Sequence, residues 1–156
     1  MALVITTPAF AANQRIPERF SRDGDNLSPK LEWRGEPPET RSFAVVVEDP
    51  DAPKGTFRHW AAYDIPPGTH LLAEGAGSQI PSAAARFTMA KNDFGNRRYD
   101  GPQPPPGHGA HHYHFRVFAL GVPKLDVPAN CAAQEVLEAA RAQALAEGDS
   151  VGLFER

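Results

Sequence analysis

The stretch HHYHFRVFAL, residues 111–120, decides how the fold is read. Side chains on a β-strand alternate between two faces, so every second residue points the same way. One face is apolar after its first residue and is expected to be buried; it carries His111, Tyr113, Phe115, Val117 and Ala119. The opposite face begins with His112, His114 and Arg116, which favours solvent. We therefore predict a strand here, with His111 and Tyr113 where the core ends.

Similar short runs occur elsewhere and are separated by turn residues. LVIT at 3–6, RSFAVVVED at 41–49 and HWAAYDI at 59–65 each predict a strand. The chain has 16 prolines and 13 glycines, which is typical of many turns and irregular connections. Residues 71–101 have too little periodicity for a core element and are expected to form a functional loop or covering flap. These patterns predict a mainly β fold.

One helix is expected near the end, over residues 131–146. Asn130 is the expected N-cap and Gly148 the expected stop. Its apolar face suits packing against a sheet and consists of Val136, Leu137, Ala140 and Ala144. Cys131 is interpreted as a small residue of this helix rather than a nucleophile.

Length and composition exclude several classes of protein. The chain has 156 residues, which fits one domain spanning 1–156, and its net charge of -3 gives no basic surface for nucleic acid. A single cysteine cannot form an intrachain disulfide. The first 20 residues lack a signal-peptide pattern, and no apolar run is long enough for a membrane span, so we expect a cytoplasmic protein without integral membrane association.

Polar residues stand where three of the predicted strands end. Asp49 follows Phe43, Val45 and Val47 on one strand face, and His59 opens the next strand on the face of Ala61 and Tyr63. Loops and strand ends are where binding sites usually lie, and a buried carboxylate needs a partner. We predict a shallow cavity lined by Asp49, His59, His111 and Tyr113.

Three kinds of site are compatible with these residues. A binding pocket is one, and no cofactor is required for it. A hydrolase or lyase that uses Asp49 and His59 as base and orienting group, with His111 stabilising charge, is the second, although the chain has no nucleophile elbow. A surface metal site on His112 and His114 is the third, although no HExxH motif, cysteine pair or calcium loop is present.

Several ordered motifs resemble one known family. They are FSRDGDNLSPKLEW at 20–33, DPDAP at 49–53, HW at 59–60, NDFG at 92–95, GPQPPPGHGAHHYHF at 101–115 and VGLFER at 151–156. Together they look like the bacterial branch of the phosphatidylethanolamine-binding proteins (PEBP), also called Raf-kinase inhibitor proteins. The resemblance covers nearly the whole chain.

This resemblance implies a large central antiparallel sheet packed on a smaller sheet, with a C-terminal helical segment. It implies a non-enzymatic pocket for small anions such as phosphate, acetate or a phosphoethanolamine head group, and it extends to a protein kinase partner and to homodimers in some relatives. By motif, the pocket residues are Asp49, His59, His111 and Tyr113, with Asp51 nearby and a wall that includes Gly101, Pro102, Pro104 and Pro105. The chain departs from the family at His112, where arginine is usual, and at Gln143, where histidine is common.

Overall fold

The computed structural model describes residues 2–78 and 86–156, and a five-stranded antiparallel sheet forms its centre. In spatial order the strands are β6 (Thr88–Met89), β4 (Phe57–Ile65), β3 (Ser42–Asp49), β7 (His111–Leu120) and β8 (Ala144–Phe154). The strands predicted at 41–49, 59–65 and 111–120 are confirmed to within two residues at each end. Because β3 is antiparallel to both β4 and β7, the end of β3 lies beside the starts of its two neighbours.

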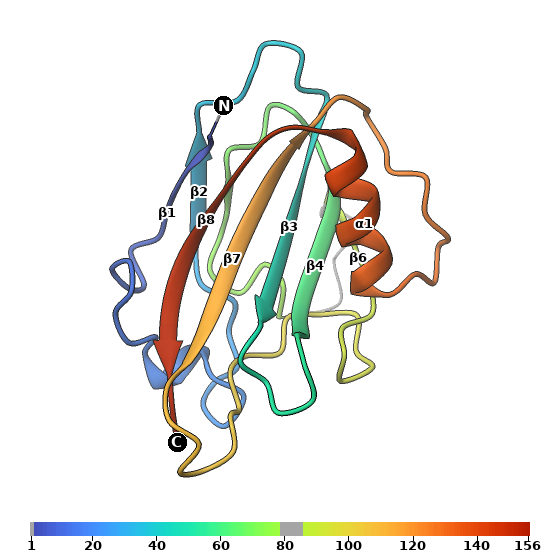
Figure 1. Ribbon diagram of the computed structural model, residues 1–156. Helices are drawn as coiled ribbons and strands as arrows, with labels where there is room; N and C mark the ends of the chain where they lie inside the picture. Colours follow the sequence, from blue (N-terminus) through green and yellow to red (C-terminus); the bar gives the residue numbers. More distant parts are fainter. Residues whose placement is uncertain (1, 79–85) are drawn as a thin grey trace.

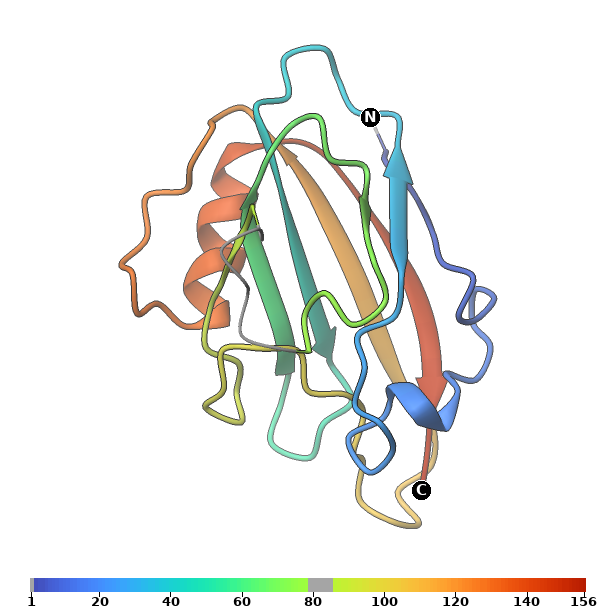
Figure 2. The same ribbon diagram turned by 180° about the vertical axis from the view of Figure 1, so that it is seen from behind.

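A smaller sheet and one helix cover the two faces of this sheet. The smaller sheet consists of β1 (Val4–Thr6), β2 (Leu31–Arg34) and β5 (Leu71–Leu72). Helix α1 (Ala133–Gln143) packs across the opposite face in Figure 1, and β2 lies in front of the large sheet when the molecule is seen from behind in Figure 2. A short 3-10 helix, η1 (Glu18–Phe20), lies in the connection between β1 and β2. The mainly β fold with two antiparallel sheets is confirmed.

Each face of the large sheet has its own hydrophobic core. Phe43, Val45 and Val47 of β3 face the smaller sheet, whereas Ala44 and Val46 face α1. All eight residues of β3 are buried because the strand is covered on both sides. The predicted inward face of β7, from His111 to Ala119, is confirmed. Phe118 and Leu120 on its other face are also buried, under α1.

The end of the predicted helix is wrong because the longest strand begins there. Helix α1 ends at Gln143, and Ala144 already pairs with Leu120 of β7. Gly148 is therefore a strand residue and not a helix stop. A Cβ atom at this position would lie 2.2 Å from the carbonyl oxygen of Leu3, so glycine allows the N-terminal segment to cross β8 closely.

The beginning of the helix also differs from the expectation. Ala132, not Asn130, is the N-cap, and its backbone N–H donates to the Glu135 carboxylate at 2.7 Å. Cys131 precedes the helix and is buried against the Tyr63 hydroxyl, with 3.6 Å between sulfur and oxygen. Within the described residues, no helix combines the length and hydropathy of a membrane span.

The segment 71–101 contributes more to the core than its sequence suggests. Leu72, Met89 and Tyr99 are buried in the core between the sheets, and the Tyr99 hydroxyl donates to the carbonyl of Phe20 at 2.7 Å. These side chains are far apart in sequence, so no periodicity reveals them. The part of the predicted flap at 79–85 lies outside the described residues.

Candidate functional site

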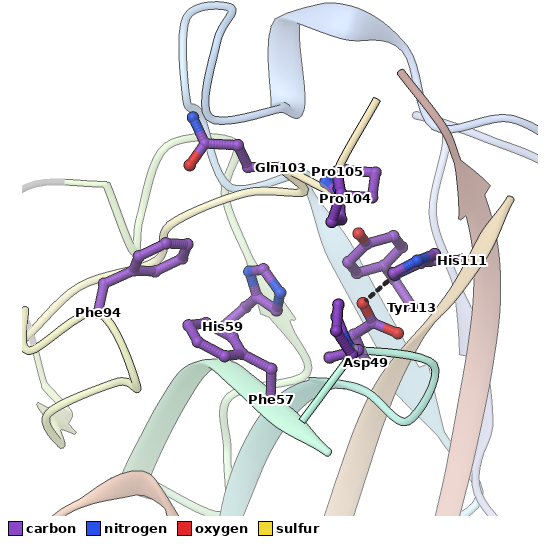
Figure 3. Close-up of a pocket in the computed structure, with 11 residues that line it drawn as sticks. Asp49, Phe57, His59, Phe94, Gln103, Pro104, Pro105, His111 and Tyr113 are labelled. Carbon is purple, nitrogen blue, oxygen red and sulfur yellow. Dashed lines mark hydrogen bonds and ion pairs between the residues drawn. The ribbon is translucent and has the colours of Figure 1, made fainter. Parts of the chain in front are cut away.

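The ends of β3, β4 and β7 converge on a pocket of about 190 Å³ at one end of the large sheet (Figure 3). It is lined by Asp49, Ala52, Pro53, Phe57, His59, Phe94, Gln103, Pro104, Pro105, His111 and Tyr113. Six of the residues predicted from sequence are therefore brought together: Asp49, His59, Pro104, Pro105, His111 and Tyr113. Their role in ligand binding stays a prediction.

Asp49 is buried at the end of β3, and both of its carboxylate oxygens are engaged. Oδ1 accepts the backbone N–H of Asp51 at 2.8 Å, which closes the turn after the strand. Oδ2 accepts from Nδ1 of His111 at 2.6 Å, and the two side chains are only 4% and 2% exposed. Both oxygens of this buried carboxylate therefore have a hydrogen-bond donor, as a buried polar group requires. The same bond fixes the orientation of the His111 ring.

His59 reaches the pocket because of a β-bulge in β4. The strand register shifts between Val47 and Glu48 of β3: Val47 pairs with Trp60, but Glu48 pairs with Arg58. His59 is the extra residue on β4, and its ring contacts Tyr113 across the pocket with 5.3 Å between ring centroids. The expectation that His59 shares a face with Ala61 and Tyr63 is wrong, because those two residues pack under α1. A bulge places two successive residues toward one face, which strict alternation cannot predict.

A hydrogen bond and burial fix the protonation state of His59. Its Nδ1 lies 2.8 Å from the backbone carbonyl of Asp100 and donates to it, so Nε2 of the neutral ring carries a lone pair. Burial lowers the pKa of His59 below its ordinary value, although the bond to Asp100 and the charge of Asp49 oppose this. His59 is therefore neutral near pH 7 and presents an acceptor.

Tyr113 contributes a hydroxyl group beside these residues. Its side chain is buried on β7. Burial raises the pKa of Tyr113 far above its ordinary value, and the charge of Asp49 adds to the shift. The phenol therefore keeps its proton and can donate a hydrogen bond to a ligand oxygen.

A buried carboxylate outside the pocket holds the loop that bonds to His59. The carboxylate of Asp100 is fully buried and accepts from the amides of Asn26, Asn92 and Asn96 at 2.8–3.0 Å. Burial alone would raise the pKa of Asp100, but these amide bonds and the charge of Arg98 lower it. The anion therefore fixes the backbone whose carbonyl orients His59, and sequence reasoning did not identify it.

Five lining residues were not predicted: Ala52, Pro53, Phe57, Phe94 and Gln103. Phe57 directly opposes Asp49 across the strand pair, so placing the start of β4 two residues earlier would have found it. Phe94 belongs to the NDFG motif at 92–95, and its ring stacks edge-on against Phe57 with 4.7 Å between centroids. These rings give the pocket one apolar wall.

Three predicted residues do not line the pocket. Asp51 turns outward and accepts from the backbone N–H and Nδ1 of His112, at 2.8 and 2.7 Å. Gly101 and Pro102 are buried and precede the wall residues in the chain. A Cβ atom on Gly101 would lie 2.0 Å from the carbonyl oxygen of Phe20, so this glycine lets the two loops pack closely.

A permanent positive charge lies at the rim of the pocket. The guanidinium of Arg22 stacks over the Phe94 ring, with 4.1 Å from its central carbon to the ring centroid. Its Nη1 donates to the side-chain oxygen of Gln103 at 2.9 Å. Arg22 thus contacts two residues that line the pocket, and its Nε lies 3.7 Å from the buried carboxylate of Asp100.

The residues predicted for the hydrolase or lyase site and for the metal site have other partners in the structure. For the hydrolase alternative, Asp49 bonds to His111 rather than to His59. For the metal alternative, His112 and His114 pair with Asp51 and Asp149, respectively. Within residues 2–78 and 86–156, no group of three or more His, Cys, Asp or Glu side chains is arranged to hold a metal ion.

The structure defines a two-sheet β protein with a small pocket at one end of its large sheet, and comparison with known proteins identifies its family. The model of the family described as phosphatidylethanolamine-binding protein matches residues 6–155. A UPF0098 protein of Aquifex aeolicus is 39% identical over 95% of this chain and 85% of its own length. The UPF0098 protein PH1269 of Pyrococcus horikoshii is 38% identical over 100% of this chain and 78% of its own length.

Solved structures agree with these relatives. The crystal structure of YbcL from Escherichia coli, described as a new member of the mammalian PEBP family, superposes with a TM-score of 0.92 and 30% identity. The match covers 100% of this chain and 99% of that chain. The chain belongs to the phosphatidylethanolamine-binding protein family.

Proposed function

We propose that the pocket binds a small oxyanion or a phosphoethanolamine head group, and that the protein acts by binding rather than by catalysis. The observation that carries the proposal is the combination of the buried Asp49–His111 pair with a donor and an acceptor on the same pocket wall. A volume of about 190 Å³ suits a head group rather than a whole lipid. This polar set lies beside an apolar wall, which is the usual composition of a small-molecule site.

The donors and acceptors favour a ligand that carries both kinds of group. The Tyr113 hydroxyl can donate to an anionic oxygen, and Arg22 at the rim adds a permanent positive charge. Neutral His59 can accept a hydrogen bond from an ammonium group or from a singly protonated phosphate. Asp49 repels an anion less than a free carboxylate would, because both of its oxygens already accept hydrogen bonds. A zwitterion such as phosphoethanolamine satisfies all these groups.

Histidine NMR provides the test. Inorganic phosphate and O-phosphoethanolamine are titrated separately, while the ring signals of His59, His111 and the outward His114 are followed. We expect saturable shifts at His59 and His111 and none at His114. Vesicles containing phosphatidylethanolamine form a third arm, which separates free head groups from lipid. No change at His59 or His111 up to roughly tens of millimolar ligand would contradict the proposal.

Tyr113→Phe is a matched variant because it removes one hydroxyl and keeps the ring. We expect it to weaken phosphate binding by about tenfold, the usual effect of losing a hydrogen bond to a charged group. The variant must keep the unfolding midpoint of the wild type to within a few degrees for this comparison to be valid. Unchanged affinity would exclude the hydroxyl from the binding site.

A protein partner, a homodimer and a cellular location are proposed from the family resemblance and the composition alone. A protein kinase or other protein partner and a homodimer come from the resemblance. A cytoplasmic location follows from a fold that needs no disulfide, since Cys131 is the only cysteine. Sedimentation equilibrium of the purified protein tests the dimer, and cell fractionation tests the location.

A further inference from the structure

The pocket histidine His111 is bonded by the chain itself at both ring nitrogens. Its Nδ1 pairs with Asp49, as described above, and its Nε2 lies 2.5 Å from Nδ1 of His108. The two imidazole rings are close, with 4.8 Å between their centroids. His108 does not line the pocket, but its side chain reaches back to the ring that does.

The position of one proton follows from these contacts. Nδ1 of His111 faces a carboxylate and therefore carries hydrogen. If the ring is neutral, Nε2 holds a lone pair and His108 donates to it. If the ring is protonated, Nε2 donates to His108. In the protonated state His108 occupies the place on Nε2 that an anionic oxygen would take, and in the neutral state it occupies the place of a ligand hydroxyl such as the P–OH group of a protonated phosphate.

His108 can leave this place without unfolding the protein. It lies in the exposed stretch 105–110, between Gly107 and Gly109, whose φ angles are +75° and +87°. The backbone of the loop is held separately, because Gly107 N–H donates to the Arg156 carbonyl at 3.0 Å and His108 N–H donates to the Pro105 carbonyl at 3.2 Å. Turning the side chain outward breaks the bond to His111 and leaves these backbone bonds intact.

We propose that His108 is an internal ligand of His111 and that an oxyanion enters the pocket by taking its place at Nε2. This inference rests on the proposed function and deepens it, because it names a residue that determines which ligands are retained. A ligand stays bound only if its bond to His111 is stronger than that of an imidazole. Phosphate and carboxylate oxygens meet this condition when Nε2 carries hydrogen, since charged acceptors form the stronger hydrogen bonds, whereas a neutral hydroxyl does not.

The test compares inorganic phosphate binding to the wild type, His108→Ala and His114→Ala. We expect His108→Ala to bind phosphate about two- to tenfold more tightly, because one net hydrogen bond no longer has to be broken. His114→Ala is the matched control, since the same substitution lies on the outward face of β7; its affinity is unchanged. In the wild type, saturating phosphate moves the ring signals of His108 to the positions of an exposed histidine.

The outcomes separate this inference from the proposed function. If the wild type binds phosphate and His108→Ala binds equally or more weakly, the displacement is wrong while the pocket function stands. If only His108→Ala binds, both are supported. If neither protein binds phosphate, the proposed function fails and the inference fails with it. His108 signals that stay fixed while those of His111 shift also overturn the displacement, whatever the variant does.

Discussion

The inward and outward faces of β7 carry the same chemical pair in different surroundings. His111 pairs with Asp49 at 2.6 Å, and His112 and His114 pair with Asp51 and Asp149 at 2.7 and 2.8 Å. The inward side chains are 2% and 4% exposed, whereas those of His112 and Asp51 are 53% and 41% exposed. The distances are nearly equal, so burial rather than geometry decides what each pair contributes.

The largest effect is expected from breaking the inward pair. Asp49→Ala leaves His111 buried without its partner and removes the acceptor of the Asp51 N–H. We expect a loss of about 3 kcal/mol or more in the free energy of unfolding, measured by urea denaturation. Asp149→Ala breaks an outward pair and is the matched control, with an expected loss of about 1 kcal/mol or less. Equal losses would show that burial does not separate the two faces.

An intermediate effect is expected from acid, through His59. Since burial lowers the pKa of His59 from the ordinary value of 6.5, the unfolded chain takes up this proton at a higher pH than the native protein. The contribution of His59 to stability is therefore complete above pH 6.5 and is lost as the pH falls from 6.5 toward the lower native pKa. This loss is measured from the thermal unfolding midpoint at pH values between about 8 and about 5.

His59→Asn provides the control for the pH experiment, because an amide can still donate to the Asp100 carbonyl but does not titrate. We expect the variant to be less stable at neutral pH and its unfolding midpoint to depend less steeply on pH. A slope identical to that of the wild type would assign the acid sensitivity to other groups.

The smallest effect is expected on the outward face. His112→Ala and His114→Ala each remove a side-chain contact with a carboxylate that is partly open to solvent. We expect each to change the free energy of unfolding by about 0.5 kcal/mol or less. Urea denaturation of both variants at low and high salt checks this, and a loss comparable to that of Asp49→Ala would remove the distinction between the faces.

The sequence predicts this inward and outward division because alternation is a property of the strand itself. The apolar positions of β7 and β3 are regular, so the places of Asp49, His111 and Tyr113 follow from counting in twos. His59 breaks this count, since its position depends on a bulge that adds one residue to β4. The pocket wall is also beyond periodicity, because Phe94 and Gln103 reach it from irregular loops.

The longest strand was missed for a different reason. The sequence ALAEGDSVGLF of β8 has alanines and glutamate, which favour a helix, and its inward positions are small. Ala146 and Phe154 belong to the core between the sheets, and a Cβ atom on Gly152 would lie 2.5 Å from the Ile16 side chain. The small residues at every second position were the sequence signal for a strand. The reason for their small size is the N-terminal segment, which packs against them in the structure.

That crossing segment also has a consequence for solubility. Strand β8 is at the border of the large sheet, where free backbone groups can recruit a strand from another molecule. Here Asn13 and Ile16 donate backbone hydrogen bonds to the carbonyls of Val151 and Leu153, and the N–H of Leu153 donates to Gln14. The irregular N-terminal stretch thus occupies backbone groups of the edge strand that could otherwise pair with another molecule. The glycines of β8 contribute to this protection because they leave room for the stretch to pack against the strand.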